Sequence, residues 1–535
     1  MKFTNPVIPG FAPDPSIVKV RDSFFIVNSS FHVFPGLPIY VSKNLQDWEL
    51  KAHAICRPSQ LDLSQAFTKL IPLPGGRAIH ITGGLFAATI RYHKGIFYVI
   101  CTNAYEDPHD HTHKFQNFYV SCPEEGIFST TGWSDPIYFD FPGIDPSLFI
   151  DPDTNRAYVH GSYRAGPPWA PDCSIRQFEI ELATGKPLTD IKFLWKGAST
   201  DAEGPHMYKK DDWYYLVTAE GSTFEGHEID ISRSRNIWGP YDGYPHNPLL
   251  TAKGRDTDIK WTGHGDFIQD EAANWFCVHL GIRYNSSNPN RHPLGRETFL
   301  TPMQWEKGEW PKITQTRMQF EVDVPGQFAQ NLIPVDNRSE NRNEDLYIRT
   351  PDLGRYMYDA ENHTYSLQAS PSALSTSLGT TTFVGLRQRQ LVSQASTTLS
   401  LAQFDHINSE INAGLAVYKD DLRFALMAFR SKSRELLVEV KSVLDMKVEK
   451  RVLGTKNVPR HVNAIHLRVT ADPDGYSFES KLGKSWEKMG RIDSSEMSGY
   501  DMTGTIFGIC TTSTQESGKY DASGEWVAFE AFTVA

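Results

Sequence analysis

Three acidic residues head similar short strings, each directly before an apolar stretch of strand length. Asp14 begins DPSIV, Asp145 begins DPSLF and Glu203 begins EGPHM. Carboxyl groups that share a pocket repel each other, so their pKa values separate and an acid and a base coexist near neutral pH. Two carboxyl groups across a glycosidic bond can hydrolyse it, and a separation of about 6.5–9.5 Å leaves room for water and inverts the anomeric carbon.

The same strings also have a structural explanation. Asp-Pro-Ser often starts a turn, because the Asp side chain accepts hydrogen bonds from its own backbone. One copy alone would be assigned to a turn. Two copies of Asp-Pro-Ser, and a Glu at the corresponding position of another repeat, favour a shared pocket for the three acids.

The elements that must carry these acids are five aromatic, strand-like runs, each after a polar turn and another short apolar segment. The runs contain Phe25, Phe97, Tyr158, Tyr214 and Trp275, at intervals of 72, 61, 56 and 61 residues. This is a hairpin pattern, with room after each hairpin for two more strands. Five such units predict a five-bladed β-propeller. An array of β-sandwiches explains the strands but not their even spacing.

Counting back from these aromatic residues reaches one position at the head of the first strand in each unit. Eleven residues back lie Asp14, Phe86, Glu203 and His264, and in the third unit, whose turn is two residues longer, Asp145 lies thirteen back. Equivalent positions of a propeller lie at similar heights around its axis. The five side chains are therefore predicted to meet at one end of the channel.

From about residue 323 the sequence changes to alternating runs typical of a β-sandwich of the jelly-roll kind. We therefore expect an all-β chain. Residues 1–322 would form the five-bladed, catalytic β-propeller, and residues 323–535 a β-sandwich that contributes to the rim of the active site.

Composition narrows the classes of function. The 535 residues include 53 basic and 64 acidic side chains, a net charge of −11, and 12% are aromatic. This argues against disorder and against nucleic-acid binding, which needs clustered Lys and Arg. We expect no membrane partner, because no stretch approaches the roughly 18 apolar residues of a span.

No signal peptide precedes the first Pro residues, so a cytoplasmic location is expected, or secretion if a leader has been removed. The six cysteines form no CxxC pair and are expected to be buried thiols.

Several strings resemble glycoside hydrolase family 43, most closely its β-xylosidases and α-L-arabinofuranosidases with a C-terminal β-sandwich. They are NPVIPGFAPDPSIV, SSFHVFPGLPIYVSKNLQDW, GIDPSLFIDPD, AEGPHMYKKDDWYYLVTAEGST and PLGRETFL. The resemblance covers the propeller and, more loosely, the second domain. It implies that Asp14 is the general base and Glu203 the general acid. Asp145 would tune the pKa of the acid and orient it.

The resemblance also implies the residues that bind substrate: Arg296 at sugar hydroxyls, Phe31, Phe86 and Thr223 in the pocket, and His264 on the channel axis. No cofactor is required, but a divalent cation such as calcium, held through water near His264, is left open. The residues alone allow plainer roles. His264 would be a core histidine with satisfied hydrogen bonds, and Arg296 part of a surface salt bridge.

One departure from the family concerns the second unit. Many of its β-xylosidases read GIWAP where this chain has GGLFAATI, so that Phe86 replaces a tryptophan and Ala88 a proline. Phe retains an apolar face but loses area and the indole N–H. We therefore expect a wider or reshaped sugar pocket, which weakens the assignment to xylose.

The predicted function is inverting, exo-acting hydrolysis that releases xylose from the non-reducing ends of short β-1,4-xylooligosaccharides. A side activity on α-L-arabinofuranosides is left open, and the alternative is an α-L-arabinofuranosidase that debranches arabinoxylan. A non-catalytic sugar-binding propeller is disfavoured, because none of the three acids is lost. A sandwich loop around residues 512–526 is expected to cross the pocket and block extended chains. A homo-oligomer is left open.

Overall fold

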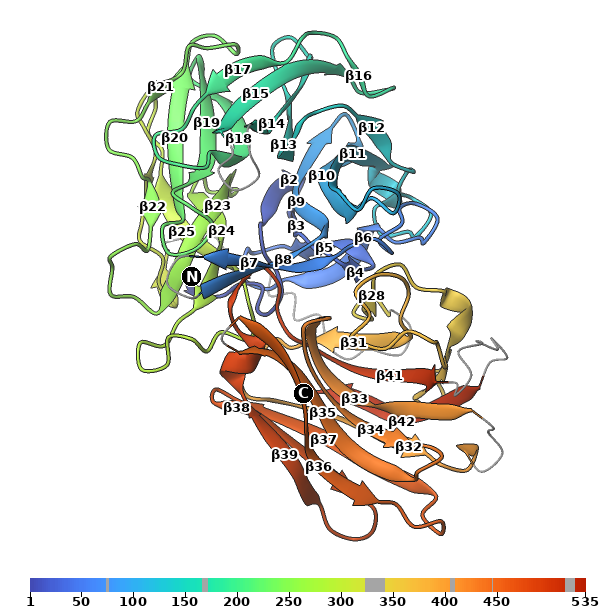
Figure 1. Cartoon of the computed structure of the whole chain (residues 1–535). Helices are drawn as coiled ribbons and strands as arrows, with labels where there is room; N and C mark the ends of the chain where they lie inside the picture. The colour runs from blue at the N-terminus through green and yellow to red at the C-terminus, as the bar shows by residue number, and fades with distance from the viewer. Residues whose placement is uncertain (74–76, 166–171, 323–341, 405–408, 445, 515–524) are drawn as a thin grey trace.

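Figure 1 shows the computed structural model of the chain, which describes all residues except 74–76, 166–171, 323–341, 405–408, 445 and 515–524. Strands dominate, and the helices of the described residues are short 3-10 turns: η1 (Glu124–Gly126), η2 (Leu353–Arg355) and η4 (Ser494–Met497). Within this described part, no helix is long and apolar enough to span a membrane. The predicted all-β class is confirmed.

Five antiparallel sheets follow one another along the first part of the chain, each with its strands in chain order. The first contains β2 (Ser16–Val20), β3 (Ser23–Val27), β5 (Gly36–Ser42) and β6 (Glu49–Ile55), and the second β9 (Gly84–His93), β10 (Ile96–Glu106), β11 (His113–Pro123) and β12 (Ile137–Phe139). The third contains β13 (Gly143–Ile150), β14 (Ala157–Ala165), β15 (Asp172–Glu181) and β16 (Lys186–Pro187), with β17 (Lys192–Trp195) also beside β15. The fourth contains β18 (Glu203–Lys210), β19 (Trp213–Glu220), β20 (Glu228–Ser234) and β21 (Asp242–Gly243), with β22 (Leu250–Thr251) also beside β20. The fifth contains β23 (Ile259–Gln269), β24 (Trp275–Arg283), β25 (Glu297–Gln304) and β26 (Lys312–Ile313).

The first strands of these sheets contact one another in a closed ring, in the order β2, β9, β13, β18, β23 and back to β2. Apolar side chains between neighbouring sheets form the core, as where Phe139 meets Phe178 and Tyr158 packs with Leu216. The ends of the ring are joined by β1 (Lys2–Thr4), which pairs with β27 (Gln319–Glu321). This is the predicted propeller, with the first strand of each sheet innermost.

The second part of the chain forms two sheets that share one apolar core. One contains β29 (Tyr356–Asp359), β30 (Thr364–Gln368), β42 (Trp526–Val534), β32 (Ser393–Ser400), β37 (Ala464–Asp472), β38 (Gly475–Lys481) and β39 (Glu487–Asp493). The other contains β31 (Phe383–Arg387), β41 (Ile506–Thr514), β33 (Glu410–Asp420), β34 (Arg423–Arg430), β35 (Glu435–Leu444) and β36 (Lys447–Asn457). The predicted β-sandwich is confirmed. Its predicted boundary after residue 322 adjoins residues outside the described part and stays a prediction.

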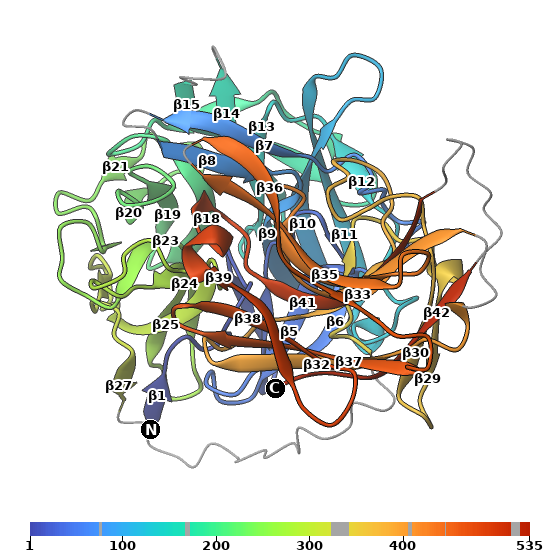
Figure 2. The same ribbon diagram turned by 60° about the horizontal axis from the view of Figure 1, so that its bottom comes forward.

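Two strand pairings join the domains, and the sandwich lies across one face of the propeller (Figures 1 and 2). β4 (Val33–Phe34) pairs with β28 (Tyr347–Ile348). The hairpin of β7 (Thr68–Leu73) and β8 (Arg77–Thr82) is extended by the parallel strand β40 (Tyr500–Asp501), which belongs to the sandwich part of the chain. The sandwich is therefore bonded to loops at one end of the propeller channel.

Candidate active site

The predicted acids lie at the heads of the innermost strands, where regular pairing begins or is interrupted. The pairing of β13 with β14, and of β18 with β19, is irregular at these positions. Asp14, Asp145 and His264 all have left-handed backbone, with φ of 48°, 53° and 50°. Bulged or left-handed residues turn their side chains away from the regular direction of the strand. The acid-bearing residues thereby face the channel end rather than the sheet neighbours.

The fourth sheet differs by one residue from the count made on the sequence. Its left-handed residue is Gly204, with φ of 49°, so Gly204 rather than Glu203 is equivalent to Asp14 and Asp145. A Cβ atom on Gly204 would lie 2.6 Å from Nδ1 of His264, so a side chain would collide with that ring. The interval of eleven residues is thus wrong by one in this unit. Glycine fills the shared position there, and Glu203 precedes it.

Asp145 and Glu203 are neighbours at this end; Asp145 is buried and Glu203 is half-buried. The backbone N–H of Gly204 donates to Oδ2 of Asp145 over 3.1 Å, which joins the third strand of the ring to the fourth. Burial and then the charges of Glu203 and Asp14 raise the pKa of Asp145 well above its usual range. A carboxyl group in this environment is protonated at a pH where an exposed one is ionised.

Glu203 has one cationic partner. Nη2 of Arg164 lies 2.9 Å from Oε1 of Glu203. Burial raises the pKa of Glu203, and Arg164 partly offsets this rise. Sequence reasoning missed Arg164, although it directly follows the aromatic run of the third unit, on the strand that pairs with the Asp145 strand.

Asp14 and Arg296 form the other side of the cluster. Ser29 donates its hydroxyl to Oδ2 of Asp14 over 2.5 Å, and Nη1 of Arg296 lies 3.7 Å from Oδ1. Arg296 is 3% exposed, so it is not part of a surface salt bridge. Its Nη2 donates to the carbonyl of Thr223 over 2.7 Å, whereas its buried Nε has no hydrogen-bond partner among the described residues. A buried donor without a partner is ready for a hydroxyl group of a ligand.

Two protein-family models match the chain that carries this carboxyl cluster. The model of "Glycosyl hydrolases family 43" matches residues 3–311, and that of the "Beta xylosidase C-terminal Concanavalin A-like domain" matches residues 346–534. The chain belongs to glycoside hydrolase family 43. It is therefore a glycoside hydrolase, and the resemblance seen in its motifs is confirmed.

Similar family 43 proteins cover nearly the whole chain. The non-reducing end α-L-arabinofuranosidase of Bacteroides ovatus is 30% identical over 564 residues, which span 98% of this chain and 94% of that protein. The β-xylosidase of Bacillus subtilis is 30% identical and spans 91% of each chain. The crystal structure of the xylan β-1,4-xylosidase from Bacillus halodurans superposes with a TM-score of 0.82 at 25% identity, covering 99% of both chains.

The aromatic residues predicted for the family 43 pocket lie together. The rings of Phe31 and Phe86 are 5.6 Å apart, and Phe86 is a further 6.2 Å from Phe115. Phe31 is buried, whereas Phe86 is half-buried and Phe115 is 44% exposed. The wall at Phe86 thus continues outward through Phe115, which the sequence did not indicate.

In the described residues, the sandwich reaches the site through residues 500–503, and the predicted loop at 512–526 stays a prediction. Most of the predicted loop at 512–526 lies outside the described residues. In the described part, Tyr500 and Met502 pack with Phe224, whose ring lies 5.5 Å from the Arg296 guanidinium. The backbone at Thr503 contacts Gly295, where an added Cβ would lie 2.0 Å from the Thr503 carbonyl oxygen. The rim contribution therefore includes residues 500–503.

His264 is buried at the channel end, and its ring meets that of His206 edge-on at 5.9 Å. Burial lowers the pKa of His264, so the ring is neutral near pH 7. Among the described residues, no group of three or more His, Cys, Asp or Glu side chains is arranged to hold a metal ion. The structure therefore offers no set of direct ligands, and a cation held through water stays a prediction.

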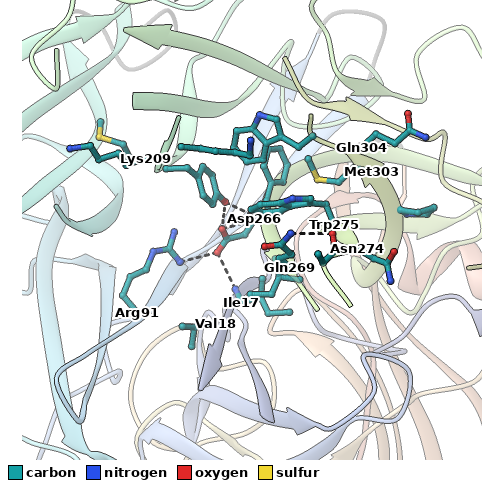
Figure 3. Close-up of a pocket in the computed structure, with 18 of the residues that line it drawn as sticks. Ile17, Val18, Arg91, Lys209, Asp266, Gln269, Asn274, Trp275, Met303 and Gln304 are labelled. Atoms are coloured by element: carbon teal, nitrogen blue, oxygen red, sulfur yellow. Dashed lines mark hydrogen bonds and ion pairs between the residues drawn. The ribbon is translucent and has the colours of Figure 1, made fainter. Parts of the chain in front are cut away.

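A cavity of about 1150 Å³ opens at the opposite end of the channel (Figure 3). Its lining includes Val18, Arg91, Asp266 and Trp275 and none of the three predicted acids. We therefore do not assign this cavity to hydrolysis, in spite of its size. The candidate site is the carboxyl cluster on the sandwich side.

Proposed function

We propose that this family 43 enzyme releases xylose from the non-reducing ends of short β-1,4-xylooligosaccharides with inversion, and that its pocket also accepts α-L-arabinofuranosides. The observation that carries this proposal is the contrast among three carboxyl groups in one buried cluster. Asp145 and Glu203 have raised pKa values, whereas Asp14 lies beside the Arg296 guanidinium. An acid and a base are thus supported in a single site.

In this mechanism Asp14 removes a proton from water as the water oxygen attacks the anomeric carbon. Glu203 donates its proton to the leaving oxygen while the glycosidic bond breaks. Asp145 orients Glu203 through its hydrogen bond to the backbone N–H of Gly204, and burial favours the protonated form of Glu203. Arg296 binds sugar hydroxyls, and no step involves a cation. Dialysis against EDTA, with kcat measured before and after, tests the cation near His264.

Exo action is supported by the closed rim. Tyr500 donates its hydroxyl to Glu225 and accepts from Arg77 over 2.7 Å, so the sandwich, the β7–β8 hairpin and the loop beside Thr223 are tied together. A bridge of this kind shortens the space available for a sugar chain. We propose that it confines the site to chain ends.

A second candidate is an enzyme acting mainly as an α-L-arabinofuranosidase. Two observations favour it: Phe86 in place of tryptophan, and the Bacteroides ovatus relative of that name, which matches 98% of this chain. Parallel kinetics on aryl β-D-xylopyranoside and aryl α-L-arabinofuranoside decide between the two. A kcat/KM strongly in favour of the arabinoside would overturn the main proposal.

The roles of the acids are tested with leaving groups of different quality. Glu203→Gln is expected to retain more activity on a nitrophenyl glycoside than on xylobiose, because nitrophenolate needs little protonation. Asp14→Asn is expected to lose activity equally on both, since each substrate needs an activated water. Near wild-type rates in either variant would contradict the assignment, and proton NMR of the first-formed sugar anomer tests inversion.

A further inference from the structure

The motifs that supply the acids also contain residues to which the mechanism gives no role. Two positions after Asp14, Asp145, Gly204 and His264 lie, respectively, Ser16, Ser147, His206 and Asp266. Each is the first residue after the irregular position that pairs again in the regular ladder, opposite Val27, His160, Val217 and Val278. All four side chains are buried, with exposures of 0%, 1%, 1% and 1%.

Asp266 is the centre of a hydrogen-bonded group below the acids (Figure 3). Its Oδ2 accepts from the Ser16 hydroxyl over 2.7 Å, from the Ile17 backbone N–H over 3.0 Å and from Nη1 of Arg91 over 2.9 Å. Its Oδ1 accepts from the Tyr208 hydroxyl. Both carboxylate oxygens are thus used, and the charge is paired with a guanidinium.

Arg91 extends the group to the remaining strands. Its Nη2 lies 3.0 Å from Nδ1 of His206, which is also 3.2 Å from the Ser147 hydroxyl. Because an arginine can only donate, His206 accepts at Nδ1 and carries its proton on Nε2. Burial lowers the pKa of His206 to about 3, which agrees with a neutral ring. Asp266, Arg91, Ser16, Ser147 and His206, here called the hub, therefore join all five innermost strands.

The hub lies where the strands are least constrained by pairing. A bulge leaves its extra residue out of the ladder, so the ladder alone does not fix the direction of that side chain. Ser16, Ser147, His206 and Asp266 follow these positions, whereas Arg91 lies further along β9 in its regular part. Their side chains bond across the ring instead of along a sheet. They also separate the acids from the far cavity, which Arg91 and Asp266 line.

We propose that the hub positions the catalytic carboxyl groups by holding the five irregular strand heads in register with one another. The proposal rests on the catalytic roles proposed above. Hydrolysis is sensitive to such placement, since a displacement of about 1 Å can cost on the order of a hundredfold in rate. The hub residues do not touch substrate, so they are positioning residues.

The test compares Asp266→Asn with the double variant Arg91→Met/Asp266→Asn. The single variant leaves the half-buried Arg91 charge without its Asp266 counterion, and kcat is expected to fall about a hundredfold, with KM changed less than threefold. The double variant removes both charges, so its melting temperature is expected to recover. Its kcat is expected to stay at least tenfold low, because His206 has lost its donor.

Glu179→Gln is the matched control, because it breaks the ion pair with Arg156 in the third sheet, away from the hub. Its kcat is expected to stay within twofold of the wild type. A double variant with wild-type kcat would overturn the proposal. So would a result in which kcat falls in proportion to the drop in melting temperature in every variant, the control included, because the loss would then reflect stability alone. If Asp266→Asn does not fold, the double variant decides alone. Glu203→Gln is assayed in parallel: wild-type activity in that variant refutes the proposed acid, whereas its inactivity beside an active hub variant refutes only the hub.

Discussion

Two groups of acidic residues, one at the active site and one at Asp501, both act on the Arg296 guanidinium, and they differ in their counterions. At the active site, burial and the charge of Glu203 raise the pKa of Asp145. At the domain interface, Asp501 lies 3.0 Å from Lys419 and also pairs with Arg423. Burial opposes its ionisation, but these two cations lower the pKa of Asp501 to about 2.

This difference in counterions distinguishes a structural role for the group around Asp501 from a chemical role for the group around Asp145. Asp501 has two cations at contact distance, whereas the ion pairs found at the active site involve Glu203 and Asp14 rather than Asp145. Breaking such a pair strands a buried charge, whereas neutralising one of several crowded carboxyl groups relieves repulsion. A buried aspartate therefore stabilises the region around Asp501, whereas at Asp145 a buried aspartate lowers the stability of the active site.

The largest effect is expected from Asp145→Asn at the active site. We expect kcat/KM to fall about a thousandfold, because Asp145 bonds to the backbone N–H of Gly204, the residue after Glu203, and its replacement displaces the proposed general acid. The free energy of unfolding is expected to stay the same or rise, because a buried acid in a crowded cluster is neutralised. Kinetics and urea denaturation on one preparation measure both, and a large loss of stability would remove the contrast with Asp501.

Asp501→Asn at the interface is expected to do the opposite. The free energy of unfolding should fall by about 3 kcal/mol, because Lys419 loses its carboxylate and keeps the Met497 carbonyl, while Arg423 keeps Asp420 and the Ser498 carbonyl. Urea denaturation at pH 7 measures this change. A loss below about 1 kcal/mol would mean that the interface pairs contribute no more than surface pairs do.

The pH dependence of stability should distinguish the two groups, because the pKa shifts of Asp501 and Asp145 have opposite signs. The folded pKa of Asp501 is depressed to about 2, so its stabilisation is present above the usual Asp value and is lost as the pH falls from about 4 to 2. This amounts to roughly 2 kcal/mol. The folded pKa of Asp145 is raised, so the stability of Asp145→Asn relative to wild type should increase as the pH rises above about 4. Denaturation at a series of pH values tests both, and equal pH dependence in the two variants contradicts the assignment.

The smallest effect is expected from Phe86→Trp. The larger indole should narrow the pocket and raise the xyloside-to-arabinofuranoside ratio of kcat/KM by about three- to tenfold. Phe128→Trp, at a 56% exposed position beside Phe25 and away from this wall, is the matched control. A ratio unchanged within twofold in Phe86→Trp, or changed equally by the control, would show that this wall does not select the sugar.

Much of the fold could be predicted because it is local. The aromatic composition and flanking turn residues of segments such as 94–104 predict strands, and the repetition of these segments indicates a propeller. The offset at Glu203 arose because two tyrosines are adjacent in the fourth unit. Tyr215 pairs with Tyr208 as Phe25 pairs with Val18, so Tyr215 rather than Tyr214 is equivalent to Phe25, and only the strand register shows this. Arg164 was also missed, since its partner Glu203 is remote in sequence and meets it only across two sheets.

The sequence by itself determined the repeat, the acids that head three of its strands, and the change to a sandwich. Only the tertiary structure decided which cation faces which carboxylate, that Gly204 occupies the shared position, and that residues 500–503 reach the rim. The physical reason is distance along the chain. Strand formation depends on neighbouring residues, whereas the Asp266–Arg91 and Asp501–Lys419 pairs exist only once the ring has closed and the sandwich has docked.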